Sequence, residues 1–186
     1  TSGGHGGTNA YKMKFMGNRG VFAGGASSVD TIEYITISTP GNATDFAELT
    51  SGRTYINGGS SGYRGVFGGG NPSPILDTID YITISVLSDA LDFGELTEAR
   101  FGYGTASSDT RCVFSSGYDG STNIDSKEFI TMNTLGSAID FGDVTASRRY
   151  GIGTSDGARG LFGGGYDGSS SLNLLEFITF VSLGNA

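Results

Sequence analysis

The residues best suited to bind a ligand lie in three glycine-rich segments, GYDGSTN (117–123), GYDGSSS (165–171) and GNPSPIL (70–76). Their candidate binding residues are Tyr118, Asp119, Tyr166, Asp167 and Asn71. Tyrosine rings stack on sugar rings, and carboxylates accept hydrogen bonds from sugar hydroxyls, so a glycan is the ligand that these loops favour. The alternative is structural, because Asp-Gly is a preferred pair in tight hairpin turns.

Groups that could carry catalysis are few. His5 is the one histidine of the sequence, so a metal site with several histidine ligands cannot be built, and a Ser-His-Asp triad could use only His5. Glycosidase chemistry needs two placed carboxylates, and the acids that stand out here recur at regular spacing, as structural positions do. The glycine run GGGYDG (163–168) lacks the Gly-Lys-Ser/Thr of a P-loop. We expect no enzymatic activity, no cofactor and no catalytic or metal-binding residue.

Composition narrows the choice of partners. The chain has 19 acidic and 11 basic residues and a net charge of −8, with no basic patch, so we expect no nucleic-acid binding. No apolar run approaches the roughly 18 residues of a membrane-spanning helix, so we expect no membrane insertion. Glycine is abundant, with 33 of 186 residues, but 9 Tyr and 12 Phe argue against disorder.

Three phrases recur along the chain. RGVFGGG at 64–70 has near copies at 19–25, 111–117 and 159–165. IDYITIS at 79–85 has near copies at 32–38, 127–133 and 175–181. LDFGELT at 91–97 has near copies at 44–50 and 139–145 only. The phenylalanines of the first phrase are 45, 47 and 48 residues apart: Phe22, Phe67, Phe114 and Phe162. A fixed period of this length is typical of repeat architectures.

A further arginine precedes each copy of the first phrase except the first copy. Arg53, Arg100 and Arg148 stand eleven residues before Arg64, Arg111 and Arg159, while Thr8 stands eleven residues before Arg19. Seven residues after each leading arginine comes a serine: Ser60, Ser107 and Ser155. The small residues that follow the leading arginines suit a strand packed where space is tight.

Each unit of about 47 residues therefore holds four strand-like phrases and no helical period. Four strands per unit predict an all-β fold, a β-propeller with one four-stranded sheet, or blade, per unit. Glycine after each GVF permits close approach of backbones and sharp turns. We expect residues 1–186 to be a single repeat domain, with four blades at about 8–50, 53–97, 100–145 and 148–186, of which the last is incomplete.

The order of these phrases resembles the kelch repeat. RGVFGGG matches the kelch strand that ends in two glycines, and IDYITIS matches the strand with the kelch tyrosine. Phe46, Phe93 and Phe141 stand where kelch repeats usually carry tryptophan, which this chain lacks. The amino-acid sequence of these phrases is similar to that of kelch-like repeats in structural proteins of tailed phages, especially marine ones. That resemblance covers nearly the whole chain and implies a virion or tail-fibre role.

The recurring charges are expected to be structural, because a residue repeated in every unit serves what every unit shares. The recurring charges are the arginines of the first phrase, the acids just before the aromatic residue of the second phrase and the aspartates of the third: Arg19, Arg64, Arg111, Arg159, Glu33, Asp80, Glu128, Glu176, Asp45, Asp92 and Asp140. Arginine pairs with carboxylates in a planar, two-pronged fashion, so we expect such pairs to connect strands or blades.

The last unit stops at SLGNA (182–186), before a third phrase, so we expect an open sheet edge near Ala186. We expect the chain to be a fragment of a longer propeller; the alternatives are a four-bladed ring and an assembly in which chains share strands. The open edge also predicts protein partners or self-assembly. With the resemblance, this favours a non-enzymatic, adhesive propeller of a virion or extracellular protein that displays loops to a host-surface glycan or protein. No signal peptide is visible in this chain. The alternatives are an intracellular kelch-type protein-interaction module and a fragment of a carbohydrate-active enzyme.

Overall fold

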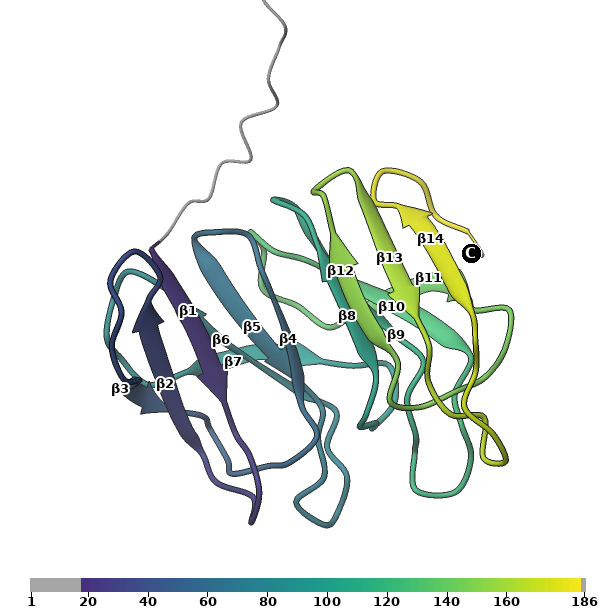
Figure 1. The fold of residues 1–186 in the computed structure, drawn as a ribbon, viewed down its shortest axis with the longest axis horizontal. Coiled ribbons are helices and arrows are strands. Elements are labelled where there is room, and N and C mark those ends of the chain that lie inside the picture. The colour runs from purple at the N-terminus through teal and green to yellow at the C-terminus, as the bar shows by residue number, and fades with distance from the viewer. Residues whose placement is uncertain (1–17, 185–186) are drawn as a thin grey trace, which may run out of the picture.

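The computed structural model describes residues 18–184, and these form fourteen strands in four antiparallel sheets (Figure 1). Sheet 1 holds β1 (Arg19–Ala23), β2 (Thr31–Thr36) and β3 (Thr44–Glu48). Sheet 2 holds β4 (Asn57–Ser60), β5 (Arg64–Gly68), β6 (Thr78–Thr83) and β7 (Leu91–Glu95). Sheet 3 holds β8 (Gly104–Ser107), β9 (Arg111–Ser115), β10 (Ser126–Thr131) and β11 (Ile139–Asp143). Sheet 4 holds β12 (Ile152–Ser155), β13 (Arg159–Gly163) and β14 (Leu175–Thr179).

The all-β prediction is confirmed, and each recurring phrase forms the same strand in its sheet. The first phrase forms β1, β5, β9 and β13, the second forms β2, β6, β10 and β14, and the third forms β3, β7 and β11. Consecutive strands pair antiparallel in every sheet. The first strand expected of the unit at 8–50 falls before residue 18 and lies outside the described residues. Among the residues described, no helix is long and apolar enough to cross a membrane.

The sheets pack face to face in chain order. Three clusters of buried side chains fill the spaces between sheets 1 and 2, sheets 2 and 3, and sheets 3 and 4. Each space contains the phenylalanine of the first phrase from the later sheet: Phe67, Phe114 and Phe162. Burying each such ring stabilises the fold by about 1.5–3 kcal/mol. The alternating pattern of the phrases thus places apolar side chains on both faces of a sheet.

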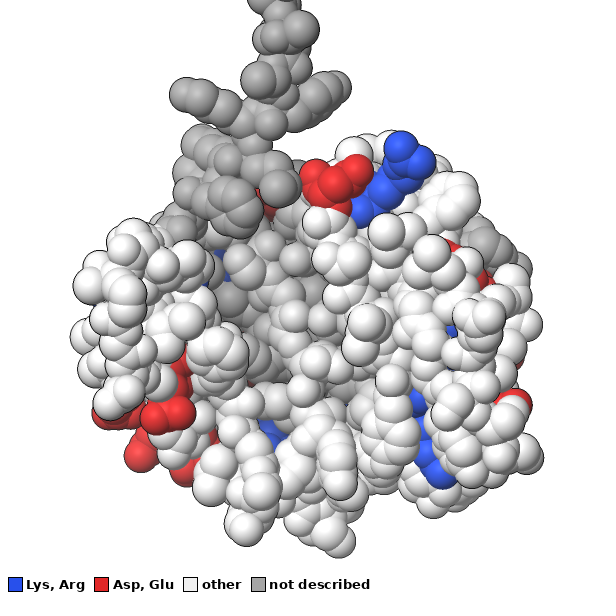
Figure 2. Space-filling view, in the orientation of Figure 1, with Lys and Arg blue, Asp and Glu red and all other residues white. Residues whose placement is uncertain are grey.

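The shortest strands, β4, β8 and β12, lie next to one another along a central hollow of about 530 Å³ that β1 also lines (Figures 1 and 2). Gly153 allows this approach, because a Cβ there would collide with the backbone of Thr105. The predicted serines connect these strands: Ser155 Oγ donates to the Ser107 carbonyl at 2.5 Å, and Ser107 Oγ donates to the Ser60 carbonyl at 3.0 Å. Small residues are therefore needed where the strands are closest.

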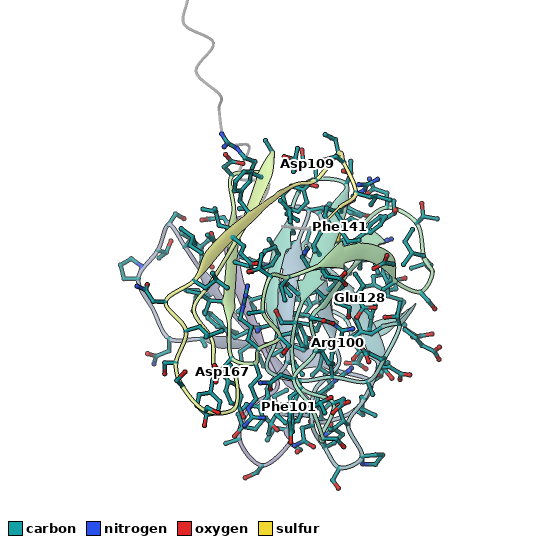
Figure 3. All side chains as sticks on the ribbon, turned by 90° about the vertical axis from the view of Figure 1, so that its right-hand side faces the viewer. Arg100, Phe101, Asp109, Glu128, Phe141 and Asp167 are labelled. Atoms are coloured by element: carbon teal, nitrogen blue, oxygen red, sulfur yellow. The ribbon has the colours of Figure 1, made fainter. Side chains whose placement is uncertain are left out.

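Buried ion pairs attach sheets 2, 3 and 4 to the segments that enter them. Arg53 pairs with Asp80 and Arg148 with Glu176, while Arg100 Nη2 lies 2.9 Å from Glu128 Oε1. All three arginines are at most 1% exposed. A threonine three residues before each arginine donates its backbone N–H to the same acid. We call these three sites the buried arginine clamps, and Figure 3 shows Arg100 beside Glu128 in the interior.

The structure bears out arginine–carboxylate pairs for three recurring acids, Asp80, Glu128 and Glu176, and corrects the partners expected for the other recurring charges. Carboxylates pair with the leading arginines, whereas Arg64 Nη1 donates to the Met132 carbonyl at 2.7 Å and Arg111 Nη1 donates to the Phe180 carbonyl. Asp92 and Asp140 accept hydrogen bonds from Gly94 and Gly142, two residues on in their own strands. Asp45 and Arg159 are exposed. The physical reason is burial, because an acid on β6, β10 or β14 reaches the buried arginine while the aspartates of the third phrase point to solvent.

Candidate functional site

The predicted binding loops gather at one end of the molecule. Each connects the second strand of its sheet to the third, and beside them lie the segments that enter β4, β8 and β12. Figure 3 shows Phe101 and Asp167 together at this end and Asp109, in the β8–β9 turn, at the opposite end. Neighbouring loops contact one another, since a Cβ on Gly120 would lie 2.9 Å from Ile75 Cδ1. Loops from different sheets therefore present one continuous surface.

Tyr118 and Tyr166 are brought together by Arg149. The Arg149 guanidinium carbon lies 4.3 Å from the Tyr118 ring centre and 5.3 Å from that of Tyr166. Its Nη1 donates to Asn123 Oδ1 at 3.4 Å. Backbone pairs hold the loops, with Tyr118 paired to Phe101 and Arg149 paired to Tyr166. A cation between two ring faces is attractive by about 0.5–2 kcal/mol for each ring, so Arg149 fixes both tyrosines.

Three further aromatic residues extend this arrangement. The ring centres of Tyr55 and Phe101 are 5.5 Å apart, and those of Tyr55 and Tyr150 are 6.1 Å apart. Phe101 in turn contacts Tyr118 edge to face at 5.5 Å. Tyr55 is 58% exposed and Tyr150 50%, whereas Phe101 is buried beneath them. We call the whole set the aromatic loop cluster: Tyr55, Phe101, Tyr118, Arg149, Tyr150 and Tyr166.

Backbone geometry explains why Tyr55 and Tyr150 meet although they belong to sheets 2 and 4. Both have left-handed backbones, with φ of 55° and 58°, and Gly102 between them has φ of 63°. Gly102 N–H donates to the Tyr55 carbonyl at 3.1 Å, and Tyr150 N–H donates to the Gly102 carbonyl at 2.5 Å. A Cβ on Gly102 would lie 2.9 Å from the Tyr150 ring. Glycine in the middle unit therefore leaves the space that the two rings share.

The predicted aspartates stabilise turns. Asp119 Oδ1 accepts the backbone N–H groups of Ser121 at 2.6 Å and Thr122 at 2.7 Å. Asp167 Oδ1 accepts those of Ser169 and Ser170, both at 2.7 Å. These backbone hydrogen bonds hold the pKa of both carboxyl groups below the usual range, because they stabilise the ionised form. The turn alternative is thus supported for Asp119 and Asp167.

Asn71 has a positional role as well. Its backbone N–H donates to the Thr54 carbonyl at 2.9 Å, and Thr54 Oγ1 donates to the Asn71 carbonyl at 3.0 Å. These bonds hold the loop at 70–76 against the segment that carries Tyr55. Asn71 therefore supports the aromatic loop cluster through its backbone and lies outside the cluster itself.

The groups whose pKa is raised most lie in the interior of the molecule. No group of three His, Cys, Asp or Glu side chains within residues 18–184 is close enough to hold a metal ion. Burial raises the pKa of the Cys112 thiol to about 12 and raises that of the Tyr103 hydroxyl. Both side chains are fully buried between sheets 2 and 3. His5 lies outside the described residues.

No protein-family model matches the chain, and no curated protein matches its sequence.

Two members of the aromatic loop cluster, Tyr118 and Tyr166, were predicted from the sequence as binding residues. The other four were not. The missed residues occupy the first and second positions after the leading arginines, where the units carry Thr54–Tyr55, Phe101–Gly102 and Arg149–Tyr150. The sequence did contain a signal for them. The leading arginine is the same in three units, whereas the two positions directly after it differ between those units, as residues of a binding surface do. The contacts among them could not be predicted from the sequence, since Tyr55 lies 46 residues before Phe101 and 95 residues before Tyr150.

Proposed function

We propose that this chain is a kelch-like β-propeller segment that acts as a non-enzymatic, adhesive binding scaffold of a virion or extracellular protein. Support for the propeller comes from four antiparallel sheets that pack face to face beside a central hollow lined by β1, β4, β8 and β12. The resemblance of the repeated phrases to kelch-like repeats of tailed-phage structural proteins supports the virion setting.

The ligand that fits the aromatic loop cluster best is a glycan. Tyr55 and Tyr150 present half-exposed rings side by side, which is the observation that carries this proposal. Sugar rings stack on such faces, and tyrosine hydroxyls offer hydrogen bonds at the edge. The rings are held before any ligand arrives, by Arg149, by Phe101 and by the backbone bonds of Gly102, so little ordering entropy is lost on binding.

The experiment is a glycan array probed with the 186-residue chain and with two single variants. Tyr150→Ala removes one face of the site. Tyr63→Ala is a matched control, because Tyr63 is 56% exposed and lies in the β4–β5 turn at the opposite end of the sheets. We expect the chain and the control to bind the same glycans, and Tyr150→Ala to bind at least tenfold more weakly, about 1.4 kcal/mol. Binding that is absent, or is equal in both variants, contradicts the proposal.

A further inference from the structure

Three sheet-to-sheet interfaces inside the chain repeat one set of contacts. The later sheet contributes the phenylalanine of the first phrase, which is 8%, 0% and 2% exposed in Phe67, Phe114 and Phe162. The earlier sheet contributes the valine that precedes its own first-phrase phenylalanine: Val21 is partly buried, and Val66 and Val113 are fully buried. Each interface is therefore built from two different faces.

An arginine crosses every one of these interfaces. Arg19 Nη1 donates to the Ile84 carbonyl at 2.6 Å, Arg64 Nη1 donates to the Met132 carbonyl at 2.7 Å, and Arg111 Nη1 donates to the Phe180 carbonyl. The same guanidinium carbons lie 4.4–4.6 Å from an aromatic ring centre of their own sheet: Tyr34, Tyr81 and Phe129. The donor always belongs to the earlier sheet and the carbonyl to the later one.

The two outermost sheets each leave one of these faces uncovered. On sheet 1, Phe22 is 58% exposed and Ile37 is 62% exposed, whereas Ile84, Met132 and Phe180 at the position of Ile37 are buried. On sheet 4, Phe177 is 57% exposed and Leu161 is 39% exposed, whereas Phe129 and Val113 at the same positions are buried. Arg159, at the position of Arg19, Arg64 and Arg111, is exposed. Sheet 1 thus shows the later-sheet face, and sheet 4 shows the earlier-sheet face.

We propose that the open face of sheet 4 binds the open face of sheet 1 on a second copy of this chain. The contact repeats the internal interfaces, with Arg159 donating to the Ile37 carbonyl of the second copy and with Phe22 of that copy entering the interface. A second copy is the occupant because it carries the complementary face, while within residues 18–184 both faces remain exposed. Such a head-to-tail contact leaves another pair of faces free, so it builds rings or filaments.

The test is the mass in solution of the 186-residue chain and of two single variants, by light scattering on a sizing column over a range of concentrations. Phe22→Asp places a charge in the apolar face of sheet 1, and Phe177→Asp places a charge in the apolar face of sheet 4. We expect the wild-type chain to form species of two or more copies and each variant to be a monomer. In an equimolar mixture, the intact sheet 4 face of Phe22→Asp can bind the intact sheet 1 face of Phe177→Asp. We expect the mixture to form a one-to-one complex and nothing larger.

Leu135→Asp is the matched control, because Leu135 is 54% exposed in the turn between β10 and β11 of an inner sheet. It should keep the wild-type mass, and circular dichroism should show that all variants retain the β-sheet spectrum. A monomeric wild-type chain, a mixture that stays monomeric, or dissociation by Leu135→Asp would overturn the proposal. Each of these outcomes is independent of glycan binding, which uses the loop end of the molecule.

Discussion

Arg148 and Arg149 are neighbours in the chain and have different surroundings. Arg148 is 1% exposed and belongs to a buried arginine clamp, where it pairs with Glu176. Arg149 lies in the aromatic loop cluster, between the rings of Tyr118 and Tyr166. Arginine recurs at the first position in three units, whereas the second position holds Thr54, Phe101 or Arg149. Recurrence thus separates a residue that sheets 2, 3 and 4 all need from one that a single surface needs.

Breaking a clamp should have the largest effect on stability. Arg53→Met leaves Asp80 fully buried without its cation, and removing one partner of a buried ion pair typically costs about 3–5 kcal/mol. Urea-induced unfolding at pH 7 gives the unfolding free energies of the variant and the wild type, and their difference measures this loss. A loss below 1 kcal/mol would show that Asp80 finds another partner and that the clamp is dispensable.

The Glu176 clamp should also give a pH-dependent signature. Burial raises the pKa of Glu176, but hydrogen bonds from Thr145 and Arg148 outweigh it and leave the pKa below the ordinary 4.5. The ionised group therefore contributes stability that is fully present above about pH 4.5 and is lost as the pH falls through the lower folded-state pKa.

Glu176→Gln should accordingly lower the unfolding free energy by about 2 kcal/mol at pH 7, which is the typical contribution of hydrogen bonds to a charged group. The difference from the wild-type unfolding free energy should shrink as the pH is lowered from 7 to 3. A difference that stays constant over that range would mean that the carboxylate charge contributes nothing to the clamp.

A smaller effect is expected at Gly102, which belongs to the aromatic loop cluster. Gly102→Ala places a Cβ at a φ of 63° and 2.9 Å from the Tyr150 ring. We expect a loss of about 1–2 kcal/mol in stability from backbone strain, together with weaker glycan binding because Tyr150 must move. Stability and binding are measured on the same protein, and unchanged binding would argue against a fixed pairing of Tyr55 with Tyr150.

The smallest effect is expected for the turn aspartate Asp167. Asp167→Asn keeps an oxygen that accepts the N–H groups of Ser169 and Ser170 and removes only the charge. Glycan affinity should therefore change less than twofold, about 0.4 kcal/mol. A tenfold loss in a titration calorimetry experiment would assign the carboxylate to the ligand and not to the turn.

Local patterns were enough to predict the strands, because alternation and terminal glycines act over a few residues. The phrases at 64–70, 79–85 and 91–97 form β5, β6 and β7 as expected. The contacts of the recurring charges were harder to foresee, since Arg53 and Asp80 are 27 residues apart and belong to different phrases. Arg149 was missed for a similar reason, because its role depends on rings supplied by two loops that only the packing of sheets 3 and 4 brings together.

The comparison between neighbours is tested most directly by the unfolding free energies of Arg148→Met and Arg149→Met, measured side by side at pH 7. The account predicts a loss of about 3–5 kcal/mol for Arg148→Met, which strands a buried carboxylate. It predicts a loss of about 1 kcal/mol for Arg149→Met, which removes ring contacts at a partly exposed site. Equal losses, or a larger loss for Arg149→Met, would contradict the division between a structural clamp and a binding surface.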